Sequence, residues 1–142
     1  MSLSQETIAI IKETIPLINQ EAENVTTRMY EILFSKYPET KPMFDKAASD
    51  QHKKLAGAIA AFAGNIDNLG VLGAAVEKMA QSHVMTQVKP IHYPMVADAL
   101  ITAMGDILGE AFTDARKNAW VAAYTFLANI LMQREQELYA QQ

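Results

Sequence analysis

The 142-residue sequence contains no cysteine. This absence excludes disulfides, thiolate metal sites and cysteine nucleophiles, and it suits a reducing compartment. The sequence also lacks an excess of basic charge, because 12 lysines and arginines stand against 16 acidic residues and give a formal net charge of -4. A chain of this charge has no basic field with which to attract nucleic acid, so we expect no DNA or RNA partner.

Long apolar runs are missing as well. No stretch approaches the ~18 consecutive apolar residues that indicate a membrane-spanning helix. The first 20 residues, MSLSQETIAIIKETIPLINQ, carry acidic residues and a broken apolar pattern, unlike a secretory signal peptide with its basic start and continuous apolar core. We therefore predict a cytoplasmic protein without a membrane span.

Strand signals are absent too, since the sequence has no useful β-branched alternation and no Asn-Gly hairpin turn. Apolar residues recur instead at helical spacing. The expected elements are a helix capped by Ser4 that kinks or restarts at Pro16, a helix over 21–35, a corner of short helical turns over 36–45, a helix from Ser49 or Asp50 through Leu69, and helices over 72–84, 93–108 and 113–139, the last capped by Thr113. This pattern predicts an all-α fold in a single domain over residues 1–142.

Five polar residues fall on faces that otherwise look buried: Tyr30, Gln51, His83, Tyr93 and Glu135. Each has an ordinary interpretation. A lone histidine on an apolar face is usually a core residue bonded to backbone, Gln51 in a first helical turn can be solvated, and Glu135 can be an exposed acid near a fraying helix end. Taken together, they suggest one imidazole on one side of a cavity and hydrogen-bond donors on the other. That is the arrangement a haem iron needs.

Five longer segments carry a family resemblance: TIPLI at 14–18, YEILFSKYPETKPMF at 30–44, AIAAFAGNIDNL at 58–69, AVEKMAQSHVMTQVKPIHYPMV at 75–96 and AYTFLANILMQREQELY at 123–139. In order and spacing the chain resembles bacterial single-domain haemoglobins and the globin domain of flavohaemoglobins. The resemblance implies a globin fold of about six to seven helices around haem b. It also implies site roles: Tyr30 and Gln51 as the distal pair, Phe44 as the haem wedge, Leu55 as distal lining, His83 as the proximal iron ligand, Tyr93 and Glu135 as its hydrogen-bonded supporters, and Trp120 as core.

Three features depart from that family pattern. Ser82 stands where many relatives have a lysine that contacts the haem propionates, and Lys53, Lys54 or Lys89 could substitute for it. The connection between Phe44 and Gln51 looks a couple of residues shorter than in flavohaemoglobins. His52 follows Gln51, and a register slip of one residue would place this histidine over the iron; Leu55, one turn after Gln51, favours the glutamine.

The function implied by the resemblance is binding of O2, NO and CO at a five-coordinate haem iron, with conversion of NO to nitrate. The sequence has no Gly-rich dinucleotide motif, so we expect electrons to come from a separate reductase. Three other functions remain open: an oxygen carrier or store, a haem-based gas or redox sensor, and a helical interaction protein in which the five polar residues are coincidental. We expect a monomer or a homodimer.

Overall fold

The computed structural model describes residues 3–44 and 51–141, and the side chains of Phe44, Gln51 and His52 lie outside this description. All regular elements in the described ranges are helices. In chain order they are α1 (Gln5–Lys36), the 3-10 helix η1 (Pro38–Phe44), α2 (Gln51–Gly64), η2 (Leu69–Leu72), α3 (Gly73–Met85), α4 (His92–Leu108), η3 (Gly109–Ala111) and α5 (Asp114–Ala140). The predicted all-α fold is confirmed. None of the described helices is both long and apolar enough to cross a membrane.

Helix α1 begins where its N-cap predicts and continues further than expected. The Ser4 Oγ accepts a hydrogen bond of 3.1 Å from the Thr7 backbone N–H, which satisfies one of the unpaired donors of the first turn. Pro16 lies inside the helix, so the expected restart at this residue is wrong. An interior proline costs about 3 kcal/mol. Ile11 and Ile18, on either side of it, are completely buried and hold both halves in one core, which offsets this cost.

Helix α2 ends earlier than its apolar pattern predicts, at Gly64 instead of Leu69. At this end the Ala61 carbonyl accepts two hydrogen bonds from Asn65, one from its backbone N–H at 3.1 Å and one from its side-chain amide at 2.9 Å. Leu69 then begins η2, a separate short helix. The apolar spacing of the sequence therefore continues past the end of the helix.

The end of α3 determines how His83 is presented. Gln87 adopts a φ of 68°, and the Val88 N–H donates to the His83 carbonyl at 2.9 Å. This left-handed cap terminates the helix two residues past His83. The chain turns at Pro90 and α4 begins at His92, so Tyr93 lies in the first turn of the next helix. The predicted helix end just past His83 is confirmed.

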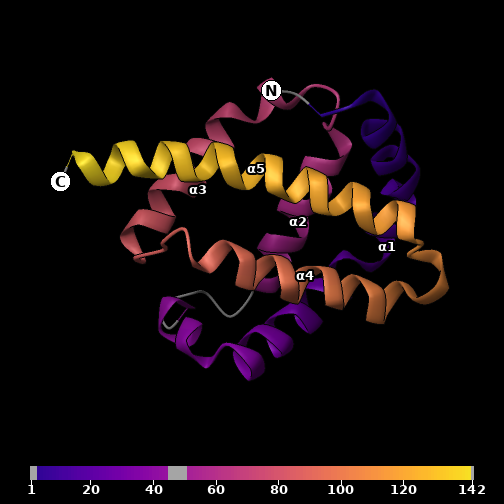
Figure 1. Cartoon of the computed structure of the whole chain (residues 1–142), viewed down its shortest axis with the longest axis horizontal. Coiled ribbons are helices and arrows are strands. Elements are labelled where there is room, and N and C mark those ends of the chain that lie inside the picture. Colours follow the sequence, from indigo (N-terminus) through magenta and orange to yellow (C-terminus); the bar gives the residue numbers. More distant parts are fainter. Residues whose placement is uncertain (1–2, 45–50, 142) are drawn as a thin grey trace.

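Figure 1 shows α5 crossing the molecule, with α3 beside its C-terminal half and α4 running alongside it. Helix α1 packs mainly on α2 and α4, whereas α3 packs mainly on α5. Within the described residues, no comparable contact joins α2 to α3, although they are consecutive helices. The main core includes Trp120, as expected, and its indole N–H donates to the Thr14 hydroxyl at 3.1 Å.

Candidate functional site

Three of the predicted residues meet between α3, α4 and α5. The His83 Nδ1 lies 2.8 Å from a carboxylate oxygen of Glu135 and 3.1 Å from the Tyr93 hydroxyl. The Tyr93 O–H donates to the Glu135 carboxylate, with O···O distances of 2.7 and 2.8 Å. Glu135 and Tyr93 are only 3% and 7% exposed, while the His83 side chain is half-buried. The Nδ1 edge of the imidazole is therefore held by two contacts.

The chemistry of these contacts determines where the imidazole proton lies. Burial and the neighbouring Glu135 carboxylate raise the pKa of the Tyr93 phenol far above its ordinary value of 10.0. The phenol therefore keeps its proton and donates a hydrogen bond to the carboxylate. The carboxylate is then an acceptor only, and His83 must donate to it through Nδ1–H. In the neutral ring this leaves a lone pair on Nε2. Within the described residues, no hydrogen bond engages that nitrogen.

His83, Tyr93 and Glu135 form a hydrogen-bonded triad, and several residues that support it were not singled out from the sequence. The Tyr124 hydroxyl donates to the Tyr93 carbonyl at 2.9 Å, and the Tyr139 hydroxyl donates to the Val88 carbonyl at 2.7 Å. Arg134 donates to the Glu77 carboxylate at 2.7 Å and so joins α5 to α3 next to Glu135. The sequence feature that could have indicated the tyrosines is their place on an otherwise apolar helix face, because a buried hydroxyl needs a hydrogen-bond partner.

Tyr30 and Leu55, the predicted distal residues that can be described, lie on α1 and α2. Both are half-buried and pack against the main core cluster. The Tyr30 ring stacks on Phe34, with centroids 5.6 Å apart and planes at 26°. Tyr30 and Leu55 therefore contact the main core cluster, whereas Tyr93 belongs to a second, smaller cluster that includes Ala80.

The remaining predicted contacts divide into two groups. Lys54 is exposed on α2, and Lys89 is exposed in the α3–α4 connection, where its Nζ lies 3.9 Å from the centroid of the Tyr139 ring. Lys53 lies in a surface groove between α1 and α2. Phe44, Gln51 and His52 cannot be placed, because their side chains are outside the described residues.

The donor set at His83 fits a metal that brings most of its own ligands. The described residues contain no group of three or more His, Cys, Asp or Glu side chains that could hold a metal ion. A single imidazole with its Nδ1–H fixed by a carboxylate is nevertheless a strong and oriented axial ligand. A metal bound at Nε2 would take its remaining ligands from outside these side chains, and a single oriented imidazole is the protein ligand in haem proteins with one proximal histidine.

Comparison with known proteins finds similarity to globins over most of the chain. The family model for globins matches residues 27–131. A globin-like protein of Aquifex aeolicus is 47% identical over 139 residues, which cover 98% of this chain and 99% of that protein. A flavohemoprotein of Rhodopirellula baltica is 46% identical over 143 residues, which cover 99% of this chain but 35% of that protein. The chain thus spans about a third of the length of this larger relative.

Solved structures agree. An engineered carbene transferase, built on a provisionally assigned nitric oxide dioxygenase of Rhodothermus marinus, superposes with a TM-score of 0.95 at 35% identity, covering 98% of this chain and 97% of that one. A flavohemoglobin of Malassezia yamatoensis, solved with bound FAD and heme, superposes with a TM-score of 0.90 at 28% identity, covering 100% of this chain and 39% of that one. The predicted family is therefore confirmed, and the chain belongs to the globins.

Proposed function

We propose that residues 1–142 act as a single globin domain that binds haem b through the Nε2 of His83 and takes O2, NO and CO as ligands. The observation that carries this proposal is the triad, in which Glu135 and Tyr93 occupy Nδ1 and leave the other ring nitrogen with its lone pair. The bound heme named in the Malassezia flavohemoglobin, a protein of closely similar fold, supports it. When bound, the haem iron supplies a coordination position for diatomic ligands.

On the proximal side, the buried carboxylate of Glu135 would act through the imidazole. Its hydrogen bond to Nδ1–H gives His83 more imidazolate character, so the ligating nitrogen donates more electron density. The Tyr93 hydroxyl, bonded to the same carboxylate, keeps Glu135 in place. Such electron donation favours chemistry on a bound diatomic ligand over simple storage.

On the distal side, we propose that Tyr30 and Gln51 donate hydrogen bonds to a partly negative diatomic ligand. A charge-assisted bond of this type contributes ~1.5–3 kcal/mol, enough to slow ligand dissociation about ten- to a hundredfold. Leu55 and Phe44 would form the apolar wall, and Lys54 and Lys89 would contact the propionates. To contact a propionate, the Lys89 side chain would have to move away from the Tyr139 ring.

The finer proposal is that the protein consumes nitric oxide in the overall reaction NO + O2 + e⁻ → NO3⁻. The flavohemoproteins among its relatives and the provisional name of the Rhodothermus protein support it. An electron donor outside these 142 residues would supply the electron. We propose that this activity takes place in the cytoplasm, and the absence of cysteine suits such a reducing compartment.

Two measurements test the proposal in order. The purified, haem-supplied chain should give a Soret band, and His83→Ala should remove stable haem retention; normal haem content in a folded His83→Ala protein would refute the ligand assignment. Stopped-flow mixing of the oxygenated protein with NO should then give rapid oxidation with nitrate as product. Slow oxidation, or simple replacement of O2 by NO, would leave an oxygen carrier or store as the function.

A further inference from the structure

Helix α3, which carries His83, is held mainly from one side. Among the described residues it packs on α5 and on η2, the short helix before it, and no comparable contact joins it to α1, α2 or α4. Its two buried residues, Ala80 and Val84, lie in the half of the helix that contains His83. The position of the imidazole therefore depends on how α3 is fixed to α5.

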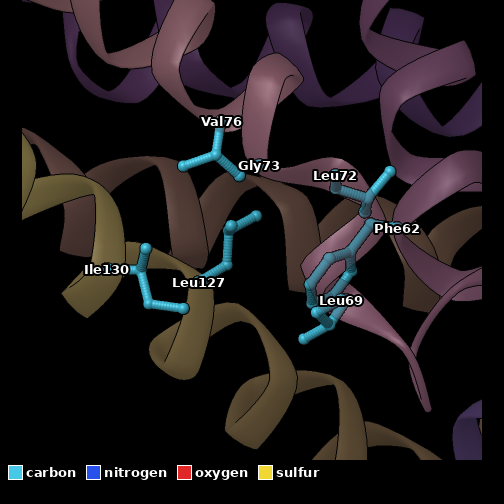
Figure 2. A pocket seen from close by; sticks show the side chains of 7 residues that line it. All are labelled: Phe62, Leu69, Leu72, Gly73, Val76, Leu127 and Ile130. Atoms are coloured by element: carbon cyan, nitrogen blue, oxygen red, sulfur yellow. The ribbon is translucent and has the colours of Figure 1, made fainter.

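Apolar packing between these helices is incomplete in the first half of α3. A cavity of about 130 Å³ is bordered by Val76 on α3 and by Leu127 and Ile130 on α5. Figure 2 shows the Val76 side chain apart from those of Leu127 and Ile130. Side chains that border a cavity lack packing partners on that side and lose the corresponding dispersion contacts. A further interaction is therefore needed to fix this part of α3 to α5.

An ion pair next to the cavity supplies that interaction. Glu77 follows Val76 on α3, and the Nε and Nη2 atoms of Arg134 on α5 each lie 2.7 Å from its Oε1. The Nε atom also lies 2.9 Å from Oε2, and Nη1 donates to Glu137 at 2.9 Å. All three guanidinium nitrogens are thus engaged. Glu77 and Arg134 are each 35% exposed, and partly exposed ion pairs contribute when they are bidentate or belong to a network, as this one does.

The ion pair crosses between the helices along a diagonal. Residues of both helices border the cavity seven and eight residues before His83 and Glu135, so the two helices run in the same direction. Glu77 lies six residues before His83, about 9 Å along α3, whereas Arg134 directly precedes Glu135. A slide of α3 along α5 would change both contacts together. Since N–H···O bonds span about 2.7–3.2 Å, a displacement of about 0.5 Å along the 2.8 Å contact of His83 with Glu135 would break it.

We propose that Glu77 and Arg134 are positioning residues, which hold α3 against α5 so that the His83 Nδ1–H meets the Glu135 carboxylate at full hydrogen-bond strength. Their effect on a bound iron rests on the proposed function, because it passes through His83, whereas their effect on the hydrogen bond needs no metal. Loss of the ion pair should weaken this bond and reduce the imidazolate character of the ring. The bond from Tyr93 keeps Glu135 in place, so the triad itself should persist.

The variants Glu77→Gln and Arg134→Met, and the double variant, test this role in the full, haem-loaded chain. Resonance Raman spectroscopy of the ferrous protein should show a lower iron–histidine stretching frequency in both single variants. The double variant should shift no further, because all three lack the same interaction. Glu137→Gln is the matched control and should keep the parent frequency, because Glu137 bonds the same guanidinium from α5 itself.

Two outcomes would overturn the positioning role. One is an unchanged frequency in Glu77→Gln and Arg134→Met, even if urea denaturation shows that both are less stable, because the ion pair would then only stabilise the fold. The other is an equal shift in Glu137→Gln, because the charge near the end of α5 would then be responsible instead of the link to α3.

Failure of the haem proposal is a separate result, because it appears as a missing Soret band. In a chain that holds no haem, the 15N chemical shift of the His83 Nδ1 reports the hydrogen bond to Glu135 directly. We expect this shift to change in Glu77→Gln and Arg134→Met and to stay the same in Glu137→Gln. An identical shift in all three variants would refute the positioning role without iron as well.

Discussion

Replacing Glu135 by glutamine tests the triad most directly, because it removes the charge and preserves the shape. The carboxylate accepts from two donors, the His83 Nδ1–H and the Tyr93 O–H, at 2.7–2.8 Å in a site that is only 3% exposed. Charge-assisted hydrogen bonds contribute ~1.5–3 kcal/mol and neutral ones ~0.5–1.5 kcal/mol. Two such exchanges should lower the free energy of unfolding by about 2–3 kcal/mol.

The amide also changes the preferred imidazole tautomer. Glutamine offers one acceptor oxygen and an NH2 group, and an NH2 facing His83 would require Nδ1 to accept. The proton would then move to Nε2, the nitrogen assigned to the metal, so this tautomer cannot hold iron and we expect weaker haem retention in Glu135→Gln. In the haem-loaded protein Nδ1–H would donate to a neutral amide oxygen instead of a carboxylate, which gives less imidazolate character, so we also expect a lower iron–histidine stretching frequency.

Urea denaturation and resonance Raman spectroscopy of the ferrous protein measure these two effects. Glu137→Gln is the matched control, because Glu137 lies on the same helix, is exposed and contacts Arg134 instead of His83. If Glu135→Gln leaves both the stretching frequency and the free energy of unfolding at the values of Glu137→Gln, then Glu135 does not act on the imidazole and the reasoning fails.

Three further predictions concern other hydroxyl and carboxyl groups. Tyr30→Phe should raise the O2 dissociation rate about ten- to a hundredfold by flash photolysis, the effect of one charge-assisted bond, whereas Tyr37→Phe, at the end of the same helix, should not; equal rates would place the Tyr30 hydroxyl away from the ligand. Burial raises the pKa of the Tyr93 and Tyr124 phenols well above the ordinary value of 10.0, so the unfolded state loses protons first and stability should fall as pH rises above about 10. Absorbance at 295 nm should show two phenols ionising only with unfolding, and early titration of all five tyrosines would contradict this. Hydrogen bonds from a lysine and a tyrosine lower the pKa of Asp98 below its ordinary value of 3.8, so Asp98→Asn should lower the free energy of unfolding at neutral pH. The difference in free energy between the two proteins should disappear as the pH falls through the native pKa. A difference that is independent of pH would show that the charge is not involved.

Local chemistry made several boundaries predictable. Ser4 and Thr113 cap their helices through side-chain hydrogen bonds, and Pro90 separates α3 from α4 as expected. Pro16 and the end of α2 were not predictable in the same way. Core packing of Ile11 and Ile18 offsets the cost of the proline, and the apolar spacing continues past Gly64, where α2 ends.

At the candidate site, too, local sequence pattern predicts some features and tertiary packing decides the others. The periodic placement of His83, Tyr93 and Glu135 on core-facing positions is a property of the sequence, and with the family resemblance it was enough to predict their association. The bracing by Tyr124, Tyr139 and Arg134, the identity of the nitrogen left on the imidazole, and the apolar cavity were decided only by the tertiary structure. Helical periodicity specifies which face a residue occupies, because backbone geometry is local. Distances between helices, and the spaces left among them, depend on how all side chains pack at once, which no local pattern encodes.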